Sequence, residues 1–199
     1  MKILLTAFEP FGGDSINPAL EAVRRVHAPQ GAELIRLEVP TVFGVSVDTV
    51  TAAMRAHCPD IVLCIGQAAG RAQITPERVA INLDDARIPD NVGAQPLDHP
   101  IRAEGPAAYF SSLPIRSLCA AITSAGIPAA ISNTAGTFVC NHLMYGVLDC
   151  IAREMPSVRG GFIHVPCIPE QAAHMAAPTP SMALSDIVRA LEAVLGALC

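Results

Sequence analysis

The chain has 199 residues, and its 13 Lys and Arg residues against 18 Asp and Glu residues give a formal net charge of −5. An acidic chain does not create the positive field that nucleic acid or anionic lipid requires, so neither is expected as a partner. Hydrophobic residues make up 51% of the chain and charged residues 16%, which excludes intrinsic disorder and predicts one folded domain over residues 1–199.

In chain order, apolar strands alternate with helices, and Gly or Pro residues stand at many of their ends. The predicted elements are a strand at 2–6, a helix from Asn17 to about His27, a strand at 33–39, a helix at 43–58, a strand at 60–65, a strand within 74–83, a helix at 114–125, a strand at 127–132, a helix at 138–154, a strand at 161–165 and a helix at 185–198. A long polar loop is expected at 84–100.

Several of these strands are apolar throughout, as strands are when both faces of the sheet are covered. The alternation with helices predicts an α/β fold, a three-layer α/β/α sandwich around a mostly parallel, twisted sheet. Ligands of such sheets bind beyond the carboxyl ends of the strands. Reactive side chains that follow strands are therefore the candidates for a functional site.

The seven cysteines are odd in number, and no two of them stand in a Cys-x-x-Cys spacing. This argues against a disulfide framework and against a zinc ribbon, so we expect a cytoplasmic protein in which most cysteines are small buried side chains. The apolar run at the start of the chain is too short for a signal peptide, and no stretch of about 18 apolar residues could span a membrane. The high apolar fraction predicts a homo-oligomer.

Cys140 is the first candidate because a Gly-containing turn at 133–137 leads into the predicted helix that holds it. A helix N-terminus favours anions, so we expect a stabilised thiolate there, and the free amides of that turn could hold a developing oxyanion. His164, at the end of a predicted strand, has the right pKa to take a proton from a thiol. His142, two residues past Cys140, points to another face of the helix.

An acid would orient the imidazole, and spacing alone leaves four candidates open. These acids are Glu77, Asp84, Asp85 and Asp90. A metal site at His164-x-x-Cys167 lacks further ligands at a convincing spacing. In the loop after the first strand, Gly12 and Gly13 do not form a nucleotide-binding motif, but Phe8 and Phe11 beside them could grip a flat, uncharged ring.

Four segments together resemble one family, the pyrrolidone-carboxylate peptidases, also called pyroglutamyl peptidases I. They are TAFEPFGG at 6–13, ITPERVAIN with DDARIPDN within 74–91, AGTFVCNHLMY at 135–145 and GFIHVP at 161–166. The resemblance spans nearly the whole chain. It implies a cytosolic cysteine peptidase, in many members a tetramer, that uses no metal or cofactor and removes the N-terminal pyroglutamyl residue from peptide substrates.

The same resemblance assigns roles to individual residues. It implies Cys140 as nucleophile, His164 as base and Glu77 as the acid of a catalytic triad, with Arg87 near the oxyanion. It implies that Phe8, Phe11, Gln67, Phe138 and Asn17 line the pyroglutamyl pocket. One departure is Ala7, where the family has Gly, so we expect an extra methyl group next to the pocket.

Two other classes of function remain open on the sequence. One is a cysteine-dependent glutaminase or deamidase, which would use the same three groups on a side-chain amide. The other is a binding module on the same fold that has lost turnover. The presence of a thiol, an imidazole and a carboxyl at the matching positions favours an enzyme.

Overall fold

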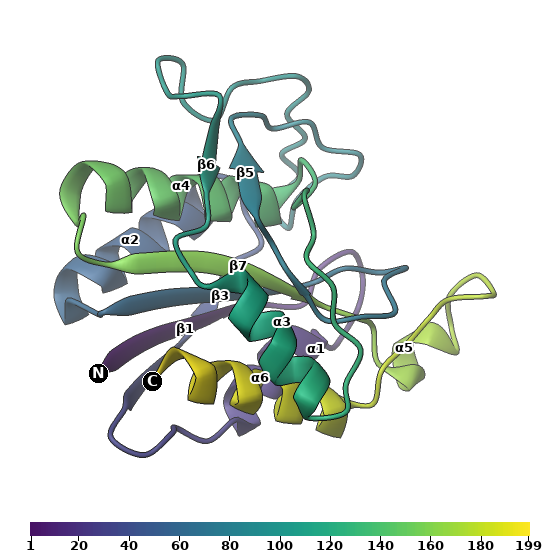
Figure 1. Cartoon of the computed structure of the whole chain (residues 1–199). Helices are drawn as coiled ribbons and strands as arrows, with labels where there is room; N and C mark the ends of the chain where they lie inside the picture. The colour runs from purple at the N-terminus through teal and green to yellow at the C-terminus, as the bar shows by residue number, and fades with distance from the viewer.

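The computed structural model describes residues 1–199, and a five-stranded sheet in the order β2-β1-β3-β7-β4 lies at its centre (Figure 1). The strands are β1 (Lys2–Phe8), β2 (Glu33–Val39), β3 (Ile61–Gln67), β4 (Thr75–Pro76) and β7 (Arg159–Val165). All neighbours run parallel except β4, which is antiparallel to β7. The predicted mostly parallel sheet is therefore confirmed.

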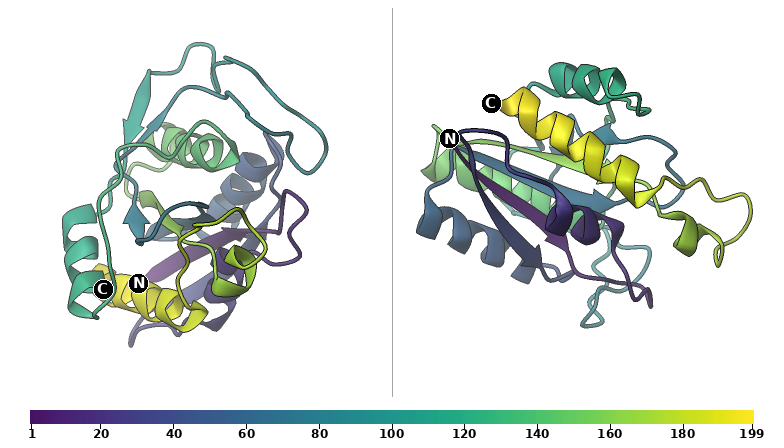
Figure 2. Two further views of the ribbon diagram at one scale, coloured as in Figure 1. Left: turned by 90° about the vertical axis from the view of Figure 1, so that its right-hand side faces the viewer. Right: turned by 90° about the horizontal axis from the view of Figure 1, so that it is seen from below.

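Helices cover both faces of this sheet (Figure 2). On one face lie α1 (Pro18–Arg25), α3 (Ile115–Ser124) and α6 (Leu184–Leu198), and on the other lie α2 (Val45–His57) and α4 (Val139–Glu154). Alternate residues of each strand enter the two cores, as Ile3 and Leu5 of β1 pack toward α1 and α6 while Leu4 packs toward α2 and α4. This is the predicted three-layer sandwich. None of the helices is both long and apolar enough to cross a lipid bilayer.

The sequence did not correctly predict three short elements. The segment 74–83 holds two strands rather than one, because the chain leaves β4 before it forms β5 (Val79–Ile81). β5 pairs antiparallel with β6 (Ala108–Phe110), and this two-stranded ribbon packs on α4. α5 (Pro169–Ala172) is a single turn that follows β7.

The strand predicted at 127–132 is wrong. This segment runs beside 74–78 and exchanges backbone hydrogen bonds with it, but the contacts remain isolated bridges, Ile74 with Ala129 and Glu77 with Ser132. Pro76, on the facing segment, has no N–H to donate to the carbonyl of Ala130, so the hydrogen bond between the two bridges is missing and no regular ladder forms. The segment nevertheless brings the chain to the carboxyl edge of the sheet, from where it enters α4.

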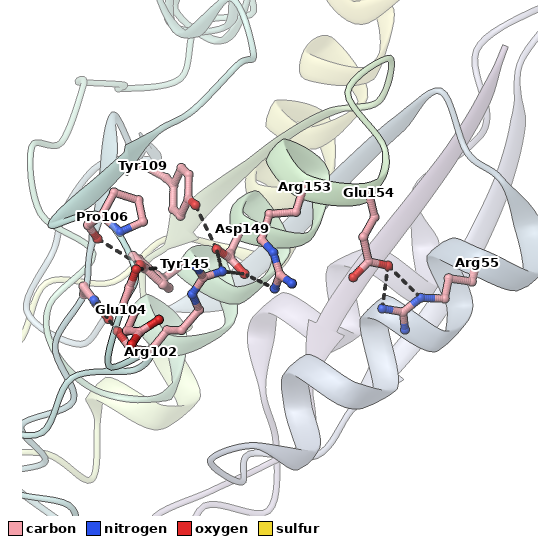
Figure 3. A network of polar contacts seen from close by, with 10 residues as sticks. Arg55, Arg102, Glu104, Pro106, Tyr109, Tyr145, Asp149, Arg153 and Glu154 are labelled. Atoms are coloured by element: carbon pink, nitrogen blue, oxygen red, sulfur yellow. Dashed lines mark hydrogen bonds and ion pairs between the residues drawn. The ribbon is translucent and has the colours of Figure 1, made fainter.

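Polar contacts fix helix α4 along its length (Figure 3). Asp149 accepts hydrogen bonds from Tyr109 Oη at 2.8 Å and from Arg102 Nη1 at 3.0 Å, which ties the helix to the β6 ribbon and to the loop before it. Arg55 of α2 donates to Glu154 near the end of α4, at 2.8 Å. Held at this end, α4 presents its first turn to the carboxyl edge of the sheet.

Candidate active site

His164 is the residue of β7 that faces α4 at the carboxyl end of the sheet. Phe162, two positions earlier on the same face, packs in the core beneath α4, and the two rings lie 4.8 Å apart between centroids. Side chains two residues apart share a face of a strand, so the apolar pattern of β7 determines where the imidazole points. The residue His164 is only 3% exposed, so its imidazole ring has little contact with water.

Cys140 lies in the first turn of α4, as the sequence predicts, and its sulfur lies over Gly66 of β3. A Cβ atom at Gly66 would stand 3.0 Å from Cys140 Sγ and 2.7 Å from Phe162 Cζ, so only glycine leaves room for the sulfur. Gly66 is the register partner of His164 on the neighbouring strand. Because neighbouring strands lie about 4.8 Å apart, the thiol and the imidazole lie near each other on the same face of the sheet.

Glu77 is the acid that the structure brings to His164. Its Oε1 accepts a hydrogen bond of 2.7 Å from His164 Nδ1, and the residue is completely buried. Its backbone N–H donates to Phe162 O at 2.9 Å, which fixes the residue directly after β4. With Nδ1 donating to the carboxylate, Nε2 of the imidazole is left free to accept a proton.

The other three acids do not contact His164. Asp84 Oδ2 binds His142 Nδ1 at 2.8 Å, and His142 Nε2 accepts from the backbone N–H of Gly44 at 2.9 Å. Both ring nitrogens of His142 are thus occupied, which agrees with its exclusion as a partner of Cys140. Asp90 accepts hydrogen bonds from nearby backbone amides, and Asp85 is exposed.

Arg71, which was not predicted from the sequence, lies against Glu77. Its Nη1 donates to Glu77 Oε1 at 2.5 Å and its Nη2 donates to Thr134 O at 3.0 Å. The only sequence signal is its place in the turn after β3, at the edge where ligands of such sheets bind. Nothing in the spacing indicates which acid or loop this arginine reaches.

Burial controls protonation in this group. Burial lowers the pKa of His164 below its ordinary value of 6.5, although Glu77 acts in the opposite direction. Burial works to raise the pKa of Glu77, but the hydrogen bond and charge of His164 outweigh it, so this pKa is lowered. At neutral pH the carboxylate is therefore charged and the imidazole is neutral.

The thiol differs from the expectation drawn from the sequence. Burial, together with the nearby charge of Glu77, raises the pKa of Cys140 to about 12. The predicted lowering of this pKa by the helix N-terminus is thus wrong, because the loss of hydration dominates. At neutral pH the sulfur therefore keeps its proton.

The first turn of α4 offers free amides to an anion. Phe138 is the N-cap residue, and no side chain caps the helix. The N–H groups of Val139, Cys140 and Asn141 have no carbonyl partner four residues earlier within the helix. An oxyanion that formed next to Cys140 could accept hydrogen bonds from these N–H groups.

Aromatic side chains gather next to the same turn. The rings of Phe11 and Phe138 lie 6.2 Å apart between centroids, and Phe43 meets Phe138 edge-on at 5.5 Å. All three are partly exposed, whereas Phe8 is 2% exposed and packs on Phe162 in the core. The family resemblance implies Phe11 and Phe138 at the pocket; Phe43, which lies far away in the chain, was not among the predicted residues.

A family model described as "Pyroglutamyl peptidase" matches residues 1–199 of this chain. The chain belongs to the pyroglutamyl peptidase family. The resemblance stated from the four sequence segments is thereby confirmed.

Individual members of the family align with this chain over 99–100% of its length. A pyrrolidone-carboxylate peptidase of Lactobacillus johnsonii is 56% identical over 199 residues, which are 100% of this chain and 92% of that protein. The crystal structure of pyroglutamyl peptidase I from Bacillus amyloliquefaciens has a TM-score of 0.95 at 52% identity and covers 99% of this chain and 96% of that one. A mutant pyrrolidone carboxyl peptidase from Pyrococcus furiosus has a TM-score of 0.94 at 38% identity, over 100% and 98%.

Three residues that the pyroglutamyl peptidase pattern implies are buried in this structure. Gln67 ends β3 next to Gly66, is buried, and its Nε2 donates to Cys167 Sγ at 3.2 Å. Asn17 caps α1, and its Nδ2 also donates to the carbonyl of Glu9. Neither Asn17 nor Phe8 is exposed, so their contact with substrate stays a prediction.

Arg87 is exposed and has no hydrogen bond or ion pair within the chain. The loop that carries it is tied to the turn before α4, because Asp85 and Thr137 exchange hydrogen bonds of 3.0 and 2.7 Å. The structure does not bring its guanidinium against the triad. Its expected role at the oxyanion stays a prediction.

Ala7, the departure from the family pattern, faces away from the site. It pairs with Ile65 in the register of β1 and β3, and both side chains belong to the core under α1 and α6. The expectation that its methyl group adjoins the pocket is wrong, because strand alternation turns it to the opposite face of the sheet.

Nowhere in the chain is a group of three or more His, Cys, Asp or Glu side chains arranged to hold a metal ion.

Proposed function

We infer that this chain is a cysteine peptidase that removes N-terminal pyroglutamate from peptides, because the family model and full-length relatives agree on that activity. We propose that Cys140 is its nucleophile, His164 its base and Glu77 the acid that orients the base. The observation that supports these roles is the hydrogen bond of 2.7 Å between buried Glu77 and His164, beside a sulfur that lies over Gly66.

Attack begins with transfer of a proton from Cys140 Sγ to Nε2 of His164. The sulfur forms a bond to the carbonyl carbon that joins pyroglutamate to the next residue, and the carbonyl oxygen becomes an oxyanion. Amides of the first turn of α4 stabilise it, each worth roughly 2.7–4 kcal/mol. Glu77 holds the imidazole in the productive tautomer and stabilises its charged form.

The leaving group takes its proton from the same imidazole. His164 protonates the nitrogen of the departing peptide as the carbon–nitrogen bond breaks, which leaves a thioester on Cys140. His164, neutral again, removes a proton from water, and the resulting hydroxide attacks the thioester. The products are pyroglutamate and the free thiol.

The aromatic group formed by Phe11, Phe43 and Phe138 suits a lactam ring. Pyroglutamate carries no charged amine, so a pocket of phenyl faces can bury it without leaving a charge unpaired. A free amino terminus would lose its hydration there without a countercharge, at a cost of several kcal/mol. We propose that this cost gives the selectivity for blocked peptides, with Gln67, Phe8 and Asn17 as further contributors to the pocket and Arg87 as a contributor at the oxyanion.

Replacement of the nucleophile tests the proposal. Cys140→Ser should reduce cleavage of a chromogenic pyroglutamyl amide by more than about 10³-fold, because the hydroxyl is a far weaker nucleophile at this burial. The matched control is Cys119→Ser on α3, on the other side of the sheet, which should keep its activity. Both variants should melt near the unmodified protein. Full turnover by the Cys140 variant would remove this residue from the role.

The same assay distinguishes the other functions. A glutaminase or deamidase would release ammonia from glutamine and leave the pyroglutamyl amide intact. A binding module would be stabilised by the pyroglutamyl compound without forming product. Release of the chromogenic amine, abolished by Cys140→Ser, is the outcome that supports a peptidase.

We further propose that the protein is cytoplasmic and a homo-oligomer, either a tetramer or a dimer. The free state of all seven cysteines suits a reducing compartment. Large apolar side chains exposed on the ribbon and on the connection between its strands suit self-association. They are Ile81, Val92, Leu97 and Phe110.

A further inference from the structure

Arg71 is a charged side chain at the site that the mechanism above does not use. It lies in the turn between β3 and β4, directly after Gly70, whose φ of +87° is a conformation that other residues rarely adopt. The Arg71 side chain is 27% exposed, whereas the Glu77 side chain that it contacts is 0% exposed. Its guanidinium therefore reaches from the surface into the buried group.

The guanidinium joins three separate parts of the site. Nη1 donates to Glu77 Oε1 at 2.5 Å and to Thr75 Oγ1 of β4 at 2.6 Å. Nη2 donates at 3.0 Å to the carbonyl of Thr134, in the loop that leads into α4 and to Cys140. One planar, always-charged group thus links the acid, the edge strand and the entry of the nucleophile helix.

The Glu77 carboxylate depends on this contact. Its Oε1 receives both His164 Nδ1 and Arg71, while its Oε2 is buried without a hydrogen-bond partner. A fully buried carboxylate stays ionised only where partners replace its hydration. Since His164 is neutral before attack, the only full positive charge that contacts the carboxylate in the resting site is that of Arg71.

We propose that Arg71 is a positioning residue for pyroglutamyl hydrolysis, which keeps Glu77 charged and directed at His164 and holds the loop that carries the chain into Cys140. This proposal rests on the triad proposed above. It acts through Glu77 and Thr134 and requires no contact between Arg71 and substrate.

The charged and titratable groups around His164 define what removal of Arg71 changes. Glu77 contacts the imidazole, and Arg71 acts on it through the carboxylate that they share. On the neighbouring strand and helix lie the thiols of Cys64 and Cys140, both protonated at neutral pH because burial raises their pKa. Removal of the guanidinium takes a positive charge away from the coupled Glu77–His164 pair, so the pair takes up a proton at a higher pH and the base is lost there.

The test compares two variants with a matched control. Arg71→Met removes the charge and all the hydrogen bonds, and Arg71→Lys keeps a charge but cannot span Glu77 and Thr134 together. Arg78→Met is the control, because Arg78 Nε binds the same loop at Asn133 Oδ1, at 2.7 Å, and has no bond to Glu77. For each protein, kcat and KM for a pyroglutamyl amide are measured across pH, together with thermal melting.

Arg71→Met should lower kcat by roughly 10- to 100-fold with KM nearly unchanged, and should move the acidic midpoint of kcat/KM to higher pH. Arg71→Lys should lower kcat but keep the midpoint, and Arg78→Met should change neither. An unchanged acidic midpoint and kcat in Arg71→Met would overturn the proposal. A lower melting temperature of Arg71→Met, together with unchanged kcat and KM of its folded fraction, would also overturn the proposal.

Arg71→Lys decides the matter if the Met variant does not fold, because an unchanged kcat in Arg71→Lys also overturns the proposal. Failure of the triad itself has a different signature. It would appear as activity that survives Cys140→Ser, whatever the Arg71 variants do.

Discussion

The environment of His164 links a single side chain to the pH dependence of the enzyme. The imidazole must be neutral to accept the Cys140 proton, and burial lowers its pKa below 6.5. The proposed active form is thus present above the lowered pKa and is lost as pH falls through it. Burial also raises the pKa of the Cys140 thiol to about 12, so this thiol is protonated at neutral pH.

We expect kcat/KM for a pyroglutamyl amide to rise with pH to a plateau, with an acidic midpoint below 6.5, and to stay on that plateau through neutral pH. Initial rates at low substrate concentration, in buffers of constant ionic strength, measure this directly. A midpoint above 6.5 would mean that His164 is stabilised in its charged form in the free enzyme, contrary to the effect of burial seen here.

At the residue scale, the sequence predicts the groups whose position follows from one element. Cys140 at a helix start and His164 at a strand end both lie where the pattern predicts them. The choice of Glu77 among four acids came only from the family resemblance, since it depends on a contact across 87 residues of chain. Arg71 and Phe43 were missed for the same reason: each reaches the site through tertiary contacts that leave no periodicity in the sequence.

At the scale of elements, β3 and α4 approach each other closely because Gly66 has no side chain. Gly66→Ala would put a methyl group 2.7 Å from Phe162 Cζ and 3.0 Å from Cys140 Sγ. We expect it to destabilise the fold by about 1–3 kcal/mol, since the core must shift to accept it. We also expect activity to fall more than 10-fold, because a displacement of about 1 Å is costly in catalysis.

Chemical denaturation and the pyroglutamyl-amide assay measure the two effects. Gly196→Ala in α6 is the matched control, since a Cβ there meets no atom within 4 Å. It should leave activity unchanged and raise stability slightly, as alanine is favoured over glycine inside a helix by up to about 1 kcal/mol. Wild-type activity in Gly66→Ala would show that the sulfur does not need this close approach.

The helices and strands of seven residues or more were predicted well, and those of two to four residues were not. α2, α4 and α6 lie within a few residues of their predicted bounds because each has an apolar face over three or more turns. The strand predicted at 127–132 fails because an apolar run says nothing about the segment it pairs with, where Pro76 has no N–H to donate. β6 has three residues, too few for a period-2 pattern to be visible.

At the scale of the whole molecule, the apolar ribbon bears on assembly. Phe110 is 69% exposed and Leu97 is 64% exposed, on a face that no other element covers. Association would remove these side chains from water, at about 25 cal/mol per Å² of apolar surface. Folding of the three-layer sandwich does not require burial of this ribbon, because one core lies on each side of the main sheet.

We expect the protein to sediment as a homo-oligomer and Phe110→Lys to shift it toward smaller species, because a charge at the contact loses its hydration. Sedimentation velocity at several concentrations measures the change. Val45→Lys on α2 is the control, as this exposed apolar residue lies outside the ribbon. A monomeric wild-type protein, or equal assembly of all three proteins, would contradict the role of this face.

The position of β7 has a consequence for how the enzyme is made. β7 is the last strand in the chain, yet it lies between β3 and β4 in the sheet. A nascent polypeptide that ends before residue 159 lacks the strand that joins β3 to β4, and it lacks the imidazole of His164. With His164 as the proposed base, we expect hydrolysis to start only after β7 has left the ribosome and products that end before β7 to be inert.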